Sequence, residues 1–194
     1  MLWENVAYLV DDGRRAVAFE DLRQRVGLDP RQILSAPADL LADIARVGLV
    51  PDQRAAKMHE SARLALTEDL GELPTLSIDQ ARRRLKKFWG IGTPGADKIL
   101  LVSGAHVTPS VESNGLRVLG RLGAVQELPS YDRMYRAARA FLEAELGLDR
   151  DVLIRAYELL RRHGHEQCKR TAPLCVICPL KKGCAWYRHA KVAP

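Results

Sequence analysis

The chain has 194 residues, which is enough for one large or two small domains with a sizeable core. Hydrophobic residues make up 47% of it and charged residues 28%, a balance that excludes an intrinsically disordered chain. The formal net charge of +6 suits a polyanionic partner, although unrelated basic proteins share it. No secretory signal is visible, and no apolar run reaches the roughly 18–20 residues of a membrane helix. We therefore expect a cytoplasmic protein that contacts no membrane.

The hydrophobic period is helical along nearly the whole chain, and no alternating strand pattern of useful length occurs. Ser77 and Gln80 form a capping box, which predicts the start of a helix. The clearest predicted helices cover residues 37–47, 51–71, 78–88, 112–122, 131–146 and 151–163. This pattern predicts an all-α protein.

A tight turn with two glycines separates two helices in the stretch from Leu85 to Leu100. Gly90 and Gly92 permit positive φ and a close approach of the backbone, as a helix-hairpin-helix requires. The amides of the turn and of the next helix's first residues can hold a DNA phosphate. The five cations within residues 82–87 add long-range attraction. For this motif alone, an αα-hairpin without a ligand is the alternative.

All four cysteines lie near the C-terminal end with the spacing C-x6-C-x2-C-x5-C: Cys168, Cys175, Cys178 and Cys184. Four thiolates can close a [4Fe–4S] cluster. The spacing lacks the paired knuckles of a common zinc site, although zinc held by all four thiolates remains an alternative. The loop after the first cysteine carries Lys169 and Arg170, which a bound cluster would present to phosphates. A solvated surface loop is the other interpretation.

With these motifs, the chain resembles the endonuclease III/adenine glycosylase branch of the helix-hairpin-helix DNA glycosylase superfamily. That family shows the same cysteine spacing after a hairpin of the form L-P-G-V-G-x-x-x-A, and the likeness extends over nearly the whole chain. The resemblance implies a six-helix bundle that carries the hairpin at about 78–103, and a cluster domain with its loop at 168–184. Turn-forming residues at 104–109 place the boundary, which gives domains over 1–105 and 106–194. It also implies a [4Fe–4S] cofactor and double-stranded DNA in the cleft between the domains. We expect a nucleoid-associated monomer in which Gly90, Gly92, Gly95 and Lys98 join Lys169 and Arg170 in holding the DNA backbone.

The resemblance also places the active site, with two departures. In the family, a catalytic aspartate in a V-D-T-H stretch follows a hairpin lysine by eighteen positions. Here the counterpart is Val111-Glu112-Ser113-Asn114, and the lysine position is Pro94. Glu112 would serve a monofunctional base excision repair glycosylase, which flips a damaged or mismatched base and hydrolyses its N-glycosidic bond. AP lyase activity would be absent or weak, because proline offers no amine for a Schiff base.

Several alternatives stay open at this point. In one alternative, Glu112 has no catalytic role and only stabilises the N-terminus of its helix through the helix dipole. The protein would then be a catalytically inactive homologue that binds DNA and recognises damage. Lys98 would restore lyase chemistry or, as we favour, bind phosphate or water. Asp97 is expected to be a solvated helix residue. Leu49 matches a loop that could wedge a duplex open, but we favour a core leucine. Asp11 and Asp12 are expected to cap the next helix or to pair with Arg14 and Arg15.

Overall fold

The computed structural model describes residues 1–190, and this part of the chain is helical and free of strands, as the sequence predicts. Contacts divide the chain into two compact units, Met1–Gly92 and Thr93–Pro194. The division falls inside the predicted hairpin, earlier in the chain than the boundary predicted after residue 105. Among residues 1–190 we find no helix that is both long enough and apolar enough to cross a membrane.

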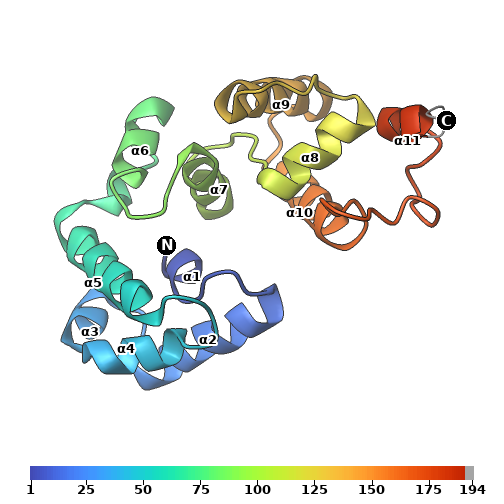
Figure 1. Cartoon of the computed structure of the whole chain (residues 1–194). Helices are drawn as coiled ribbons and strands as arrows, with labels where there is room; N and C mark the ends of the chain where they lie inside the picture. The colour runs from blue at the N-terminus through green and yellow to red at the C-terminus, as the bar shows by residue number, and fades with distance from the viewer. Residues whose placement is uncertain (191–194) are drawn as a thin grey trace. The chain divides into compact units, whose positions relative to one another are not determined.

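The first unit is built around α5, which packs against α3 and α4 (Figure 1). Its core gathers apolar side chains that recur at helical spacing, including Val6, Leu22, Ile33, Leu41, Ile44 and Met58. Its elements are α1 (Leu2–Asn5), α2 (Asp12–Arg25), α3 (Pro30–Ser35), α4 (Ala38–Ala45), α5 (Pro51–Thr67), the 3-10 helix η1 (Leu70–Glu72) and α6 (Ile78–Leu85).

The capping box predicted at the start of α6 is confirmed. The Ser77 side chain accepts from the backbone amide of Gln80, and the Gln80 side chain accepts from the amide of Ser77. The helix ends at Leu85 rather than at the predicted Phe88, which instead lies buried in the turn that follows. The apolar period therefore continued past the helix end, because turn residues also fill the core.

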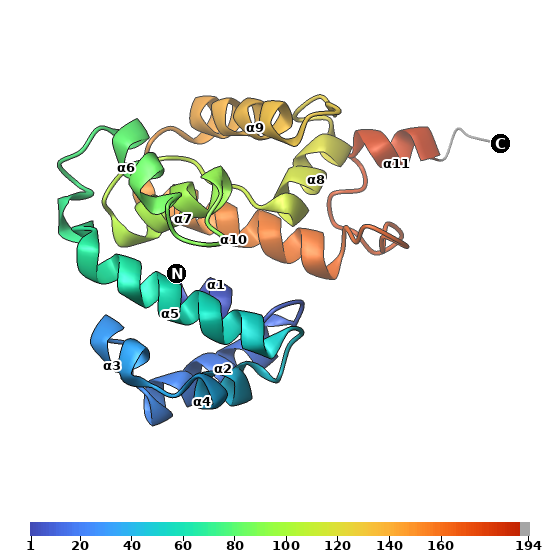
Figure 2. The same cartoon turned by 60° about the vertical axis from the view of Figure 1, so that its left-hand side comes forward.

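The second unit is built around α8, which packs against α10 (Figure 2). Its elements are α7 (Thr93–Ser103), α8 (Ser113–Leu122), α9 (Tyr131–Leu146), α10 (Arg150–Glu166) and α11 (Ala185–Ala190). Gly164 of α10 is buried, and a Cβ atom there would lie 2.5 Å from the carbonyl oxygen of Asn114. Only glycine lets α10 approach the start of α8 this closely.

Candidate active site

Glu112 is the N-cap residue of α8, and its carboxylate is held by the residues that follow it. One oxygen, Oε1, accepts from the backbone amide of Gly115 at 2.9 Å. The other, Oε2, accepts from Asn114 Nδ2 at 2.9 Å and from Ser113 Oγ at 3.4 Å. The side chain is half-buried. Glu112 therefore stabilises the start of the helix, as one of the two interpretations expected, and both of its oxygens have a fixed direction.

The segment that leads to Glu112 is anchored to α7 and α9. Ser110 Oγ donates to the carbonyl oxygen of Pro94 at 3.1 Å. Arg139 Nη2 donates to Thr108 Oγ1 at 2.9 Å, and its Nε donates to the carbonyl oxygen of Pro109 at 3.2 Å. The structure thus brings the Pro94 position, where the resembling family has its lysine, close to the residues that precede Glu112. Pro94 carries no amine at this place.

Asp97 is fully buried, so the expectation of a solvated helix residue is wrong. It accepts from the Tyr135 hydroxyl at 2.8 Å and lies 3.3 Å from Arg139 Nε. Burial, and then the charge of Asp97, raise the pKa of the Tyr135 hydroxyl, which therefore stays protonated. This buried pair ties α7 to α9 beneath the segment that carries Glu112. Asp97 has a structural partner on each side and is not placed to act as a catalytic acid.

The hairpin turn belongs to the first unit and is anchored by buried side chains. Phe88 and Ile91 are buried, and the amide of Ile91 donates to the carbonyl oxygen of Phe88 at 3.1 Å. Between them Gly90 has a φ of 77°, the left-handed conformation for which glycine was predicted. Gly90 and Gly92 are both exposed. The turn therefore presents its backbone at the surface.

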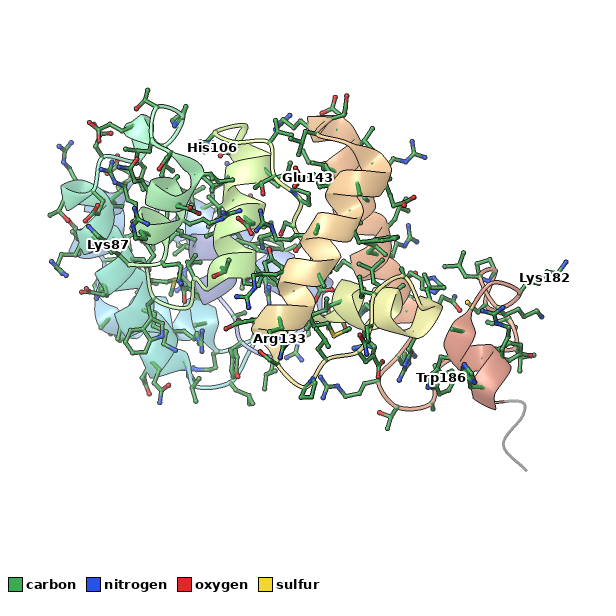
Figure 3. The ribbon with its side chains drawn as sticks, turned by 90° about the horizontal axis from the view of Figure 1, so that it is seen from above. Lys87, His106, Arg133, Glu143, Lys182 and Trp186 are labelled. Carbon is green, nitrogen blue, oxygen red and sulfur yellow. The ribbon has the colours of Figure 1, made fainter. Side chains whose placement is uncertain are left out.

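Three of the five cations upstream of the turn have acidic neighbours on the same unit. Ion pairs join Arg82 to Asp79 at 2.9 Å, Arg84 to Glu72 at 2.8 Å and Lys87 to Glu68 at 2.6 Å. Figure 3 labels Lys87 on its exposed side chain. Because local carboxylates offset these charges, the long-range attraction is weaker than the residue types alone indicated.

Gly95 and Lys98, both on α7, are half-exposed. Lys98 follows Pro94 by one helical turn, as the sequence indicated. Their assignment to the DNA backbone stays a prediction. So does the arrangement of turn, Glu112 and cysteine loop around one groove, because it combines residues of both units.

The four cysteines line one cavity between α8, α10 and the C-terminal loop, and none of them forms a disulfide. Burial, and then the charges of the three other cysteines, raise the pKa of the Cys175 thiol. Hydrophobic side chains, among them Leu180 and Trp186, complete the cavity wall. Figure 3 shows Trp186 on α11 and Lys182 on the preceding loop. The donor set and its apolar wall fit a [4Fe–4S] cluster. Among residues 1–190, no group of three or more His, Cys, Asp and Glu side chains is arranged around a single metal ion.

Polar neighbours surround the cysteine sulfurs. Arg121 Nη1 lies 3.5 Å from Cys168 Sγ, and His163 Nε2 lies 3.7 Å from Cys178 Sγ. Burial lowers the pKa of His163, which favours the neutral ring. In metal sites, contacts of this kind from neighbouring polar groups orient the ligands.

Two arginines of α8 connect the cysteine loop to the rest of the unit. Arg121 donates to the carbonyl oxygens of Lys169 and Arg170 at 2.7 and 3.1 Å. Arg117 donates to Asn114 Oδ1, to the carbonyl oxygen of Gly164 and to that of Cys168, at 2.7 to 2.9 Å. Since Asn114 also binds Glu112, one chain of hydrogen bonds links the carboxylate to the loop. Sequence reasoning missed both arginines; their i,i+4 spacing just after Glu112 was the available signal.

The Lys169 and Arg170 side chains are exposed, while their carbonyl groups face Arg121. The loop backbone is thus fixed and the two charged groups are accessible. The assignment of these side chains to phosphates stays a prediction.

Leu49 is 58% exposed, so the favoured interpretation as a core leucine is wrong. The residue after it, Val50, has a φ of 54°, and a left-handed β-branched residue costs about 1–2 kcal/mol. Leu9 is 71% exposed and has a φ of 55°, a conformation that no sequence pattern indicated. Asp11 caps α2 by accepting from the amide of Arg14 at 2.9 Å, as expected.

No protein-family model matches the chain. Three curated relatives align over most of it. Endonuclease III of Sulfolobus acidocaldarius is 26% identical, covering 91% of this chain and 76% of the relative. Thymine-DNA glycosylase of Aeropyrum pernix is 25% identical, covering 83% of this chain and 70% of the relative. A putative DNA repair glycosylase of Methanocaldococcus jannaschii is 24% identical, covering 94% of this chain and 78% of the relative.

Solved structures share the fold. A non-covalent endonuclease III–DNA complex superimposes with a TM-score of 0.78 at 17% identity, covering 98% of this chain and 83% of the other. A trapped covalent endonuclease III–DNA intermediate superimposes with a TM-score of 0.76 at 18% identity, covering 98% of this chain and 84% of the other. A thermostable thymine-DNA glycosylase superimposes with a TM-score of 0.68 at 18% identity, covering 91% of this chain and 77% of the other. The homologues and the shared fold confirm the resemblance of the chain to the helix-hairpin-helix DNA glycosylase superfamily.

Proposed function

We propose that the protein is a monofunctional DNA glycosylase of base excision repair that acts on double-stranded DNA. Homologues named endonuclease III and thymine-DNA glycosylase support the reaction class. The observation that carries the finer assignment is the pairing of a fixed carboxylate, Glu112, with a proline at the neighbouring lysine position.

The chemistry follows from these two positions. As the base departs, the sugar becomes cationic, and the carboxylate of Glu112 stabilises it and orients the attacking water. Ser113 and Asn114 keep the carboxylate aimed by donating to Oε2. Glutamate carries one methylene more than the family's aspartate, which moves the carboxylate by about 1 Å. The segment anchored by Arg139 and Ser110 sets where that longer side chain starts.

Strand cleavage through an imine needs a nucleophilic amine, and Pro94 has none. Lys98 lies one turn further along α7, where we assign it to phosphate. The exposed turn at Gly90 and Gly92, together with Gly95, would hold the DNA backbone from one side. Lys169 and Arg170 would hold it at the cysteine loop, and Leu49 would wedge the duplex while the base is flipped.

The four cysteines would hold a [4Fe–4S] cluster, whose contribution when bound is to cross-link the loop that carries Lys169 and Arg170. The purified protein should then be yellow-brown, with broad absorption near ~400 nm. Colourless protein with stoichiometric zinc would contradict this assignment.

The decisive experiment is excision from duplexes that carry uracil, a thymine–guanine mismatch, an oxidised pyrimidine, or adenine opposite 8-oxoguanine. We expect excision from at least one of them. Glu112→Gln should reduce that rate by about a hundredfold or more, while its amide still accepts from the Gly115 amide and preserves the cap. Borohydride should trap no covalent adduct; an adduct that disappears in Lys98→Ala would contradict the monofunctional mechanism.

A second function is favoured by one observation: capping α8 accounts for Glu112 without any chemistry. The protein would then be a DNA-binding homologue that recognises damage without excising it. This function would be established if the wild type and the Glu112→Gln variant both bind damaged duplex and neither excises any base.

A further inference from the structure

Three residues of α9, each one helical turn from the next, lie along the segment that leads to α8. Arg139 donates to Thr108 Oγ1 at 2.9 Å, near the start of that segment. Tyr135, one turn earlier in α9, packs in the same core cluster as Val111, near the end of the segment. The segment therefore runs in the opposite direction to α9. One more turn back along α9 brings Tyr131 to the N-cap of α8.

The Tyr131 ring is supported on one face by a fixed partner. It stacks on the Tyr135 ring, with 6.3 Å between the ring centroids and 5° between the ring planes. The Tyr135 ring is itself held, because its hydroxyl donates to the buried Asp97 at 2.8 Å. Tyr131 nevertheless keeps 46% of its surface exposed. Since Tyr135 covers one face of the Tyr131 ring, we assign this exposure to the other face and to the ring edge.

The charges around this ring are mixed. Burial, and then the negative charges of Glu112 and Asp132, raise the pKa of the Tyr131 hydroxyl, which therefore stays protonated at neutral pH. Arg133, in the same turn of α9, adds an exposed cation (Figure 3). Because acidic and basic groups offset one another here, the feature that distinguishes this surface is its aromatic face.

Resting on the proposed function, we infer that the exposed face of Tyr131 stacks on the flipped base while Glu112 acts on the sugar. In glycosidic cleavage the carboxylate and the leaving group lie next to the same sugar carbon, so a base held for excision lies near that carboxylate. Enzymes that flip a base hold it partly by stacking on aromatic side chains. A base on Tyr131 would extend the existing tyrosine stack by one ring, without reordering the side chains beneath it.

The test is binding, measured by fluorescence anisotropy, of duplexes whose target nucleotide carries a 2′-fluorine. Fluorine disfavours the cationic sugar, so the base stays attached and the readout needs no excision. The four target nucleotides of the excision assay supply the bases, and a tetrahydrofuran abasic analogue supplies a site without one. For the base-bearing duplex that the wild type binds most tightly, Tyr131→Ala should raise the dissociation constant by about fivefold or more. The constant for the abasic duplex should change by less than about twofold.

Two variants serve as controls. Tyr131→Phe keeps the ring and removes the hydroxyl, so it should bind both kinds of duplex as the wild type does. Arg136→Ala, at an exposed position of the same helix, removes a charge and no ring, so it should affect both kinds of duplex equally.

Equal losses for base-bearing and abasic duplexes in Tyr131→Ala would mean that the ring only supports α9, and they would overturn the inference, as would no loss at all. A loss in Tyr131→Phe as large as that in Tyr131→Ala would assign the effect to the hydroxyl and overturn it too. So would a wild type that binds no fluorinated duplex more tightly than intact DNA. A loss in Tyr131→Ala confined to base-bearing duplexes, with a wild type that excises no base, would leave the stack standing and contradict the glycosylase proposal.

Discussion

Around Glu112, side chains fix the local structure through polar contacts, whereas the exposed Leu9 and Leu49 are placed by contacts of the backbone. Arg139, Asp97 and Tyr135 join α7, α9 and the segment before the carboxylate through buried polar contacts. One backbone hydrogen bond and the left-handed conformations of Leu9 and Val50 set the positions of Leu9 and Leu49. The side chains of both leucines are exposed. A polar network suits a group that must keep one direction, and the two exposed leucine side chains have no such network in the described residues.

This difference predicts its largest effect at Asp97. Asp97→Ala should lower the free energy of unfolding by about 3–5 kcal/mol, because Arg139 and the Tyr135 hydroxyl lose their buried partner. Urea denaturation would measure this. Asp79→Ala breaks an exposed ion pair with Arg82 and should cost less than about 1 kcal/mol. Equal losses in the two variants would contradict the importance of the buried network.

Arg117 should be the next most sensitive position. In Arg117→Lys, one ammonium cannot reach Asn114, Gly164 and Cys168 together, so we expect a loss of about 1–3 kcal/mol. Excision should also fall by about tenfold, because Asn114 then orients Glu112 less firmly. Arg155→Lys, on the exposed side of α10, is the matched control. Unchanged excision in Arg117→Lys would mean that the carboxylate needs no support from the loop.

Alkaline pH provides a third test. The pKa of Tyr135 is raised by burial and by Asp97, so the folded protein keeps a proton that the unfolded chain releases. This contribution to stability is constant below about pH 10 and declines by up to about 1.4 kcal/mol per pH unit above it. The free energies of unfolding of wild type and Tyr135→Phe, measured between about pH 9 and 11, isolate this contribution. Free energies of unfolding that change in parallel with pH in the two proteins would contradict the prediction.

The smallest effect is expected at Val50, in the loop after α4. Val50→Gly removes left-handed strain but adds freedom to the unfolded chain, so it should raise the free energy of unfolding by about 1 kcal/mol or less. Val17→Gly, at an exposed position inside α2, should have the opposite sign and cost about 1 kcal/mol. Destabilisation by Val50→Gly would show that the turn carries little strain.

Sequence patterns predicted what depends on near neighbours. The span of α9 and the Ser77–Gln80 capping box follow from residues a few positions apart, and both are found. The cysteine spacing likewise indicated one shared cavity. Where partners are distant, the patterns failed: Asp97 binds a hydroxyl 38 positions away, and nothing in α7 alone indicates that a carboxylate faces inward.

The prediction of a core leucine at Leu49 failed for a different reason. Hydropathy assigns a leucine to the core unless the local backbone turns it outward, and non-glycine residues rarely adopt positive φ. Such exceptions are expected where function overrides local preference. The exposed leucines were therefore visible only after the two loops had been placed together.

The double use of the Glu112 carboxylate bears on how descendants of this protein would diverge. A homologue that lost catalytic activity would still gain stability from an acidic residue at position 112, because this residue caps α8. Inheritance of that residue is thus no record of activity. The excision rate of the Glu112→Gln variant, and not the identity of the residue at position 112, would separate the enzyme from the binding homologue.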